Sequence, residues 1–319
     1  MTSLVERALS LDKFSIAKII STIESSSADD SQDCVELERA LMRAKNTLGR
    51  IIGITGAPGV GKSTLINALV NEILRRDRAI SVAVVAVDPS SAVSKGSLLG
   101  DRTRVQFSDE ARTYFRSQAS DLDLGGIGKT TFRVCRLLAT IFDIIVVESV
   151  GVGQSEIEIA RLADLTLLAL QPLSGDQIQF MKSGIMEIPQ GFVITKCDAE
   201  ELAQKSYHQL VASLEFSRVV DMNTKGNHVS HRIFMTSAMN QQGFSELAEF
   251  VLDTKLLLSA QAEAREAYFI EKEIRHEWGE WGLKAFRKTS HKNTRSFEER
   301  RREVFIALPT LIREELNKL

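Results

Sequence analysis

The stretch Gly56-Ala57-Pro58-Gly59-Val60-Gly61-Lys62-Ser63 matches the phosphate-binding loop pattern G-x-x-x-x-G-K-[ST] at every position. Residues 50–55, which precede it, form an apolar run typical of a short buried strand. Five apolar residues after it share the spacing of one helix face: Leu65, Ile66, Leu69, Val70 and Ile73. A chance glycine turn is the structural alternative, and the strand and helix on either side argue against it. The sequence therefore predicts that this chain binds a nucleoside triphosphate.

The order of residues in the loop suits the chemistry of phosphate binding. Glycines let backbone N–H groups surround phosphate oxygens without a Cβ in the way. The helix that follows points its positive N-terminal end at the same oxygens. Lys62 is expected to reach the β- and γ-phosphates, and Ser63 to ligate Mg²⁺. The expected nucleotide contacts of the loop are Gly56, Ala57, Pro58, Gly59, Val60, Gly61, Lys62, Ser63 and Thr64.

The composition places the chain among ordinary globular proteins. Its 319 residues suffice for one large α/β domain with additions, and they are 44% hydrophobic and 26% charged. A net charge of −2 does not imply a nucleic-acid surface, and no apolar run is long enough to span a membrane. Cys34, Cys135 and Cys197 lie far apart, which argues against metal ligation and favours a reducing cytoplasm. The first residues resemble neither a secretory nor a transit peptide, so we expect a cytoplasmic protein.

The hydrophobic pattern predicts a doubly wound, mainly parallel α/β sheet with helical additions at both ends. Continuous apolar runs mark further strands at 82–87, 144–147, 165–170, 192–195 and 233–235. Helices are expected at 129–141, 155–163, 176–186, 201–214 and 244–254. The expected domains are a helical extension at 1–48, a nucleotide-binding domain at 49–254 and a helical arm and tail at 255–319. Ligands in such sheets lie beyond the carboxyl ends of the strands.

Two acids are candidates for the metal site. Asp88 ends the second predicted strand, where a carboxylate can hold Mg²⁺ or a magnesium-bound water, and a turn residue before Pro89 is the alternative. Residues 93–124 form a long polar segment, which is usually a functional lid or a disordered excursion. Asp101 lies in that segment and could reach the magnesium when the lid closes.

The next predicted strand ends in a candidate sensor of the γ-phosphate. Glu148 is expected to hold the magnesium shell, and Gly151 to bond the γ-phosphate through its N–H. A strand-end glutamate in a salt bridge is the alternative. Residues 124–130 look like a second phosphate loop, but Asp123 stands at the position of the first glycine. We interpret them as a glycine turn that starts a helix.

The segment Thr195-Lys196-Cys197-Asp198 indicates the base. The Asp198 carboxylate can accept hydrogen bonds from guanine N1–H and its amino group, whereas adenine would leave it unpaired. The stem of Lys196 can lie over the purine face. GTPases usually have Asn at the position of Thr195. The threonine side chain can still make one hydrogen bond. In Ser237-Ala238, a backbone N–H can meet guanine O6.

Taken together, four segments resemble the MeaB/ArgK family of P-loop GTPases: 87–91, 100–104, 148–156 and 195–198. The resemblance covers about residues 1–285, and 150–156 is its most specific part. Members of this family accompany adenosylcobalamin-dependent acyl-CoA mutases, typically methylmalonyl-CoA mutase. The chain departs from the family at Thr195, at Gly128-Lys129-Thr130 and at Gln171-Pro172-Leu173.

The resemblance implies a site and a partner. It places Lys62, Ser63, Asp88, Asp101 and Glu148 around Mg²⁺ and the triphosphate. It also implies a mobile segment at 171–182, in which Lys182 couples contact with the mutase to catalysis. The resulting hypothesis is a Mg²⁺-dependent GTPase that acts as a chaperone for the mutase. The alternatives are a P-loop ATPase or kinase linked to basic amino-acid transport, and a nucleotide-dependent scaffold without useful turnover.

The C-terminal third carries a helical pattern with two tryptophans on its apolar face. Ile270, Ile274, Trp278, Trp281 and Ala285 share that face over 255–288. It is either core or an interface, and the resemblance favours a homodimer arm. Residues 287–303 are very polar and are interpreted as a solvated linker, followed by a short apolar stretch to Leu316 interrupted by Pro309.

Catalysis is expected to be slow without a partner. No glutamine follows Gly151 directly, so the residue that positions water in Ras-like GTPases is missing from its usual place. The chain has no D-x-H-x-x-G signature for cobalamin, and its five histidines are scattered.

Overall fold

The computed structural model describes residues 2–25, 32–45, 47–88, 106–119, 127–128, 130–149, 155–172, 188–221, 232–254, 259–287 and 296–316. The chain divides into two compact units. The sheet unit is formed by Arg50–Gly128 and Phe142–Leu256, and the helical unit by Met1–Gly49, Lys129–Ile141 and Leu257–Leu319. The domain boundaries expected at 48/49 and 254/255 stay a prediction.

The sheet unit contains a seven-stranded sheet in which all neighbouring strands are parallel. Its strands, in the order β3-β2-β4-β1-β5-β6-β7, are β1 (Arg50–Gly56), β2 (Val82–Asp88), β3 (Thr113–Ala119), β4 (Ile144–Glu148), β5 (Leu165–Leu170), β6 (Gly191–Ile194) and β7 (Arg232–Met235). Its helices are α4 (Lys62–Arg76), α6 (Ser155–Leu162), α8 (Glu200–Asp221) and α9 (Phe244–Leu252). The expected doubly wound α/β class is confirmed.

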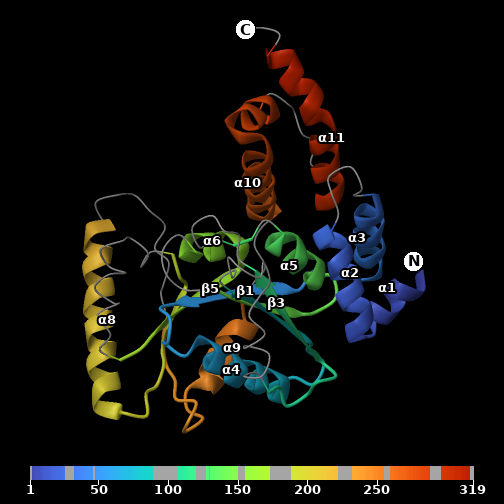
Figure 1. Ribbon diagram of the computed structural model, residues 1–319. Helices are drawn as coiled ribbons and strands as arrows, with labels where there is room; N and C mark the ends of the chain where they lie inside the picture. The colour runs from blue at the N-terminus through green and yellow to red at the C-terminus, as the bar shows by residue number, and fades with distance from the viewer. Residues whose placement is uncertain are drawn as a thin grey trace. The chain divides into compact units, whose positions relative to one another are not determined.

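Helices cover both faces of the sheet, which explains the continuous apolar runs of its strands. Ile52 and Ile54 of β1 belong to the core cluster that α4 and α9 complete. Gly53 points to the other face, where a Cβ would lie 2.4 Å from Cγ2 of Ile159 in α6. Figure 1 shows α4 and α9 on one side of the strands and α6 on the other.

Strand β3 corrects the interpretation of residues 93–124 as a lid or excursion. Residues 113–119 pair in parallel with all of β2, from Val82 opposite Thr113 to Asp88 opposite Ala119. Its sequence is polar because β3 is an edge strand with a single neighbour. Tyr114 and Gln118 are nevertheless buried. Residues 106–112 are described without regular structure, and 93–105 and 120–124 lie outside the described residues.

The helical unit contains α1 (Thr2–Leu9), α2 (Lys13–Ser25), α3 (Gln32–Ala44), α5 (Thr131–Ala139), α10 (Ser259–Phe286) and α11 (Phe297–Leu316). Helix α5 is part of this unit although it lies between β3 and β4 in the sequence. Its Phe132 stacks on Phe269 of α10 with ring centroids 4.2 Å apart, and Phe297 of α11 meets the same ring edge-on. Within the described ranges, no helix combines the length and apolar character needed to cross a membrane.

Helix α11 corrects the interpretation of 287–303 as a solvated linker over 297–303, and residues 288–295 lie outside the described residues. The helix begins at Phe297, and Glu298 and Arg301 are almost completely buried. Both charges are paired, since Glu298 accepts hydrogen bonds from Arg133 at 2.7 and 2.9 Å and Arg301 pairs with Glu273. At Glu298 and Arg301, polar residues therefore mark buried ion pairs and not a solvated segment. The helix also includes Pro309, which we expected only to interrupt an apolar stretch.

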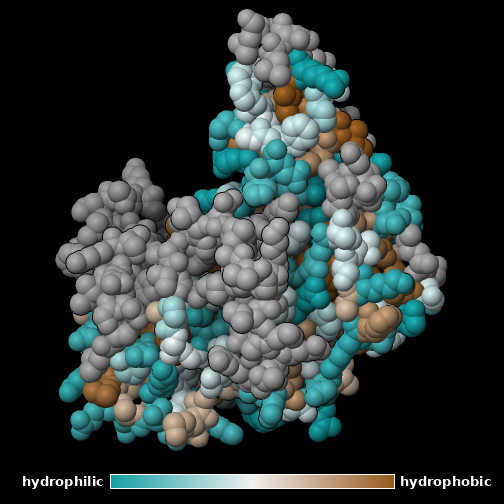
Figure 2. All heavy atoms as spheres, in the orientation of Figure 1, coloured by the Kyte–Doolittle hydropathy of each residue, from teal (hydrophilic) through white to brown (hydrophobic). Residues whose placement is uncertain are grey.

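Helix α10 does not bury the whole apolar face that its sequence predicts. Ile270, Ile274 and Ala285 are buried, whereas Trp278 and Trp281 are 37% and 44% exposed. Gly279 lies between the tryptophans with φ 62° and ψ −158°, outside the helical region, so the helix kinks there. Brown apolar atoms reach the surface of the part formed by α10 and α11 in Figure 2.

Candidate functional site

The phosphate-binding loop joins the carboxyl end of β1 to the start of α4, in the middle of the sheet. Two of its glycines are required by geometry. Gly61 caps α4 with a left-handed φ of 98°. Gly56 has φ 147°, and a Cβ there would lie 2.4 Å from the carbonyl oxygen of Ala169 in β5. These constraints set the loop directly over the N-terminus of α4.

Lys62 is buried at the base of this loop. Its Nζ donates hydrogen bonds to the carbonyl oxygens of Gly56 at 2.9 Å and Ala57 at 3.2 Å. The ammonium group is thus folded inside the loop, where phosphates would meet the backbone N–H groups and the positive end of α4. This position suits the role expected for Lys62, which stays a prediction.

Ser63 and Glu148, two predicted magnesium ligands, meet in the structure. The Ser63 hydroxyl donates to Glu148 Oε1 over 2.9 Å. Strand pairing brings them together, because Glu148 of β4 lies opposite Ile54 of β1 in the parallel register. Beside them, Ser149 Oγ donates to Thr55 Oγ1 at 2.8 Å and fixes the two strand ends to each other.

The chemistry of these donors fits a magnesium ion. Mg²⁺ prefers oxygen ligands and is usually held by one or two carboxylates together with waters and substrate phosphates. Ser63 and Glu148 supply a hydroxyl and a carboxylate at the phosphate loop. In the part of the chain that the structure describes, no group of three or more His, Cys, Asp or Glu residues could hold a metal by itself.

The remaining predicted residues of this region are only partly placed. Asp88 ends β2 at the same edge of the sheet as Glu148, because Ala86 lies opposite Glu148 in the register. The structure does not describe the orientation of its side chain. Asp101, Gly151 and Lys182 lie outside the described residues, so their roles stay predictions.

A cavity of about 300 Å³ adjoins the phosphate loop and contains the residues predicted to bind the base. Its lining consists of Gly61, Thr64, Leu65, Thr195, Lys196, Asp198, Thr236, Ala238, Met239 and Phe244. The segments after β6 and β7 contribute to one pocket, since Cys197 N donates to the Thr236 carbonyl at 3.0 Å. Thr64, Thr195, Lys196, Asp198 and Ala238, which were predicted separately, therefore share a pocket.

Lys196 is oriented along the phosphate loop. It has a left-handed φ of 53°, and its Nζ donates to the Gly59 carbonyl at 2.8 Å and to Gln171 Oε1 at 3.0 Å. Its stem runs past Gly61, where a Cβ would lie 3.8 Å from Lys196 Cε. An apolar stem fixed at this place can form one wall for a planar base.

Sequence reasoning missed part of the pocket. Met239 is 83% exposed at its rim, Phe244 is buried at the start of α9, and Leu65 was assigned only to the helix face. An antiparallel bridge between Ser237 and Gln242 closes the turn that brings Met239 and Phe244 to the pocket. Predicted Ser237 is fully buried, and its Oγ accepts from Asn240 N at 3.2 Å rather than lining the cavity. Gly243, with φ 79° just before Phe244, is the signal that could have indicated this turn.

Neighbouring groups change the acidity of a thiol beside the base pocket. Burial raises the pKa of Cys197, and the negative charge of Asp198 raises it further. The thiol donates to the Ile194 carbonyl at 3.2 Å. Cys197 is thus a neutral group at physiological pH and not an activated nucleophile.

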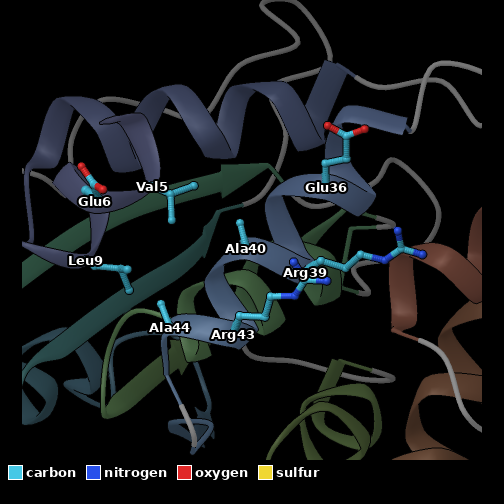
Figure 3. A pocket seen from close by; sticks show the side chains of 8 residues that line it. All are labelled: Val5, Glu6, Leu9, Glu36, Arg39, Ala40, Arg43 and Ala44. Atoms are coloured by element: carbon cyan, nitrogen blue, oxygen red, sulfur yellow. The ribbon is translucent and has the colours of Figure 1, made fainter. Parts of the chain in front are cut away.

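A second cavity, of about 480 Å³, lies in the helical unit between α1 and α3. Figure 3 shows its lining of Val5, Glu6, Leu9, Glu36, Arg39, Ala40, Arg43 and Ala44. Its charged residues are Glu6 of α1 and Glu36, Arg39 and Arg43 of α3, and Arg39 pairs with Glu299 of α11. It contains none of the predicted nucleotide contacts.

The parallel sheet, the phosphate loop and the adjoining base pocket define the class of P-loop nucleotide-binding proteins. The profile of the family described as Methylmalonyl Co-A mutase-associated GTPase MeaB matches residues 16–278. The chain therefore belongs to the MeaB family and is a GTPase of that family, as the sequence resemblance implies.

Individual relatives agree with this assignment. A protein of Pyrococcus horikoshii that is named as a GTPase is 36% identical over 82% of this chain and 80% of its own length. A methylmalonic aciduria type A homolog of Caenorhabditis briggsae, described as mitochondrial, is 37% identical over 61% of this chain and 47% of its own length. The crystal structure of a LAO/AO transport system kinase covers 96% of this chain and 97% of that one, with a TM-score of 0.61 and 21% identity, which shows the shared fold alone.

Proposed function

We propose that this protein is a Mg²⁺-dependent GTPase that hydrolyses GTP to GDP and phosphate and serves as a chaperone for an adenosylcobalamin-dependent acyl-CoA mutase. The chaperone would protect or load a mutase of the methylmalonyl-CoA type. The observation that carries the nucleotide part is the arrangement of two sites side by side. One site is the cluster of Lys62, Ser63 and Glu148, and the other is the pocket that contains Asp198. Gly61 and Thr64 line the pocket and flank Lys62 and Ser63 in the chain, so they form the border between the two sites.

The base pocket supports guanine over adenine. Asp198 can accept two hydrogen bonds from guanine N1–H and the 2-amino group, while adenine offers it neither. Asp198 is exposed in the structure, and a bound base would cover it. An acceptor covered in this way without a partner costs about 1–3 kcal/mol, so the preference is expected to be strong. Lys196 would cover the ring with its stem, and Ala238 would offer its backbone N–H to O6.

The residues around the phosphates have complementary tasks in hydrolysis. A water oxygen bonds to the γ-phosphorus while the bridging bond to the β-phosphate oxygen breaks, so negative charge moves onto GDP. Mg²⁺, when bound, would neutralise part of that charge. Lys62 would supply the second positive charge, and Ser63 with Glu148 would fix the ion's position. Asp88 and Asp101 are proposed as further members of this shell.

The partner is proposed from the family. Its description names methylmalonyl Co-A mutase, and a worm relative is named after methylmalonic aciduria. We propose that Lys182, in the segment expected to be mobile, couples mutase contact to the γ-phosphate. The competing proposal is an ATPase or kinase of basic amino-acid transport, which the transport-kinase fold alone does not support.

Titration calorimetry with GTP, ATP and xanthosine triphosphate tests the nucleotide assignment. The wild type is expected to bind GTP at least tenfold more tightly than ATP, since one unsatisfied buried group is worth about that factor. Asp198→Asn is expected to weaken GTP and to accept xanthosine triphosphate, whose C2 carbonyl needs a donor. Equal affinities for ATP and GTP, or an unchanged base preference in the variant, would contradict the assignment.

A second assay tests the chaperone assignment. GTP turnover is measured with and without the cognate mutase in wild type, Lys182→Ala and the control Lys205→Ala, an exposed lysine on α8. We expect slow intrinsic turnover that the mutase accelerates in the wild type and the control. Fast turnover by the isolated chain would contradict the expectation that the site needs a partner for catalysis. Equal stimulation of all three forms would show that Lys182 does not couple mutase contact to catalysis.

The assembly and the compartment are proposals as well. We propose a homodimer formed through the exposed tryptophans of α10. A cytoplasmic location is supported by three cysteines that are all free thiols in the structure.

A further inference from the structure

We propose that this protein recognises guanine without a hydrogen bond to N7, because Thr195 cannot donate one. The inference rests on the proposed GTP binding and concerns how the base pocket works. It predicts that guanine and 7-deazaguanine nucleotides bind alike. Thr195 stands where GTPases usually carry Asn, so the substitution distinguishes this chain from the common pattern.

The hydroxyl of Thr195 is already committed to the phosphate loop. Thr195 is 5% exposed, and its Oγ1 lies 2.6 Å from the carbonyl oxygen of Val60. The carbonyl oxygen of Leu170 lies 3.2 Å from the same atom. A threonine hydroxyl has one proton to donate, and both of these neighbours can only accept. Two acceptors already compete for a single donor.

The short contact to Val60 decides where the proton stays. A separation of 2.6 Å is normal for O–H···O but brings two oxygens into repulsion when no proton lies between them. Turning the proton towards the base would create that repulsion and would leave the buried Val60 carbonyl without this donor. In return Thr195 would gain one hydrogen bond to N7. Because it would lose the bond to Val60 and add the repulsion between the two oxygens, donation to N7 is unfavourable.

The geometry of guanine brings N7 to this side of the pocket. Asp198 would hold N1–H and the 2-amino group, and the ribose at N9 must lead to the loop at 56–63. N7 then lies on the remaining edge, next to O6. Thr195 and Ala238 line the pocket, and Ala238 is the residue expected at O6. The Thr195 oxygen therefore faces N7 with a lone pair, where an acceptor gains nothing from another acceptor.

An asparagine side chain would behave differently at this position. Its amide group has two N–H donors, so one can bond the Val60 carbonyl while the other bonds N7. Thr195 retains the bond to the loop and gives up the bond to the base. Thr195 is thus a positioning residue for the loop, and base specificity depends on the Asp198 edge.

Calorimetric titration with GDP, 7-deaza-GDP and ADP tests this inference, since diphosphates avoid turnover. The wild type is expected to bind GDP and 7-deaza-GDP within about twofold of each other. Thr195→Asn is expected to bind GDP about fivefold more tightly than 7-deaza-GDP, which is the factor for one typical hydrogen bond. Thr195→Val, which removes the loop bond, is expected to weaken both nucleotides equally.

The outcomes separate this inference from the proposed function. A wild type that binds 7-deaza-GDP fivefold or more weakly than GDP, yet still prefers GDP to ADP, overturns the inference alone. A wild type that binds ADP as tightly as GDP overturns the guanine assignment and the inference with it. Equal binding of GDP and 7-deaza-GDP by a folded Thr195→Asn variant shows that N7 lies elsewhere and also overturns it. If Thr195→Asn fails to fold, the comparison of GDP with 7-deaza-GDP in the wild type still tests the inference.

Discussion

Lys62 is the residue on which the phosphate site depends most. Its ammonium group is held inside the loop by the carbonyl oxygens of Gly56 and Ala57. Lys62→Ala is expected to lower GTP turnover by about 10²–10³-fold, because the developing charge on the phosphates loses its counter-charge. Single-turnover hydrolysis of GTP measures the effect, with Lys205→Ala on the exposed surface of α8 as the control. Retained turnover in Lys62→Ala would show that the reaction occurs at another site.

Part of this site could be predicted from the sequence because its residues follow parallel strands. The ends of β1 and β4 must lie at one edge of the sheet, so Ser63 and Glu148 were expected close together and meet at 2.9 Å. The commitment of Thr195 to Val60 could not be predicted in the same way. It depends on the distance between β6 and the loop, which only the folded sheet sets.

At the scale of the elements, hydrophobic patterns predicted the strands that helices cover on both faces. They missed β3, the edge strand that pairs with a neighbour on one side. The runs at 82–87, 144–147 and 165–170 became β2, β4 and β5 with nearly the same bounds. Strand β3 was missed because an edge strand can be polar and still have a full ladder of backbone partners on β2. Its existence depends on a long-range pairing that no local pattern records.

The junction of β1 and the loop gives a prediction about glycine. A side chain at Gly56 would meet the Ala169 carbonyl oxygen at 2.4 Å, whereas a Cβ at Gly59 has no heavy atom within 4 Å apart from its chain neighbours. Both residues have positive φ, 147° and 78°, so both alanine variants carry backbone strain, about 1–2 kcal/mol for Gly59 and more for Gly56. The difference between the variants therefore measures the clash together with the additional strain at Gly56.

Gly56→Ala is expected to lower the free energy of unfolding by about 2–4 kcal/mol and Gly59→Ala by about 1 kcal/mol. Urea unfolding followed by far-UV circular dichroism measures both. The larger loss arises because β5 must move away from β1, and the paired strands leave it little room. If the two variants lost equal stability, the contact between Gly56 and Ala169 would not be close in solution.

At the scale of the whole molecule, the helical unit joins three distant segments through buried charges. Glu298 pairs with Arg133 of α5 and lies 4.0 Å from Arg301, and its backbone N–H donates to Glu38 of α3. Arg136 bonds the same Glu38, at 3.2 Å, and Glu266 of α10. The sequence could not predict this network, because Arg133 and Glu298 are 165 residues apart. Polar residues at 297–303 resembled a linker for this reason.

Breaking this network is expected to destabilise the fold strongly. Glu298→Gln removes the buried carboxylate that pairs with Arg133, which is expected to cost about 3–5 kcal/mol. Glu280→Gln, whose partner Arg275 is more than half exposed, is the matched control and is expected to cost at most about 1 kcal/mol. Thermal unfolding of the two variants gives the comparison. Equal melting temperatures would mean that water reaches Glu298 and screens its charge.

The exposed tryptophans bear on how many copies of the chain assemble. Trp278 and Trp281 flank the kink at Gly279 and are partly exposed, whereas Ile270 and Ile274 of the same helix are buried. Lys284 lies 5.2 Å from the centre of the Trp281 ring, so the ring already has a cation on one side. Large aromatic groups left on a surface are typical anchors of an interface.

If these tryptophans form the proposed homodimer, replacing both with alanine should produce a monomer. Anchors of this type contribute about 2 kcal/mol or more each, so the dissociation constant is expected to rise by at least about 30-fold per tryptophan. Light scattering after size-exclusion chromatography, over a dilution series, measures the change. Phe14→Ala removes an even more exposed aromatic residue, on α2, and is expected to leave the mass unchanged. A monomeric wild type would contradict the dimer, and dissociation by Phe14→Ala would place the interface on α2 instead.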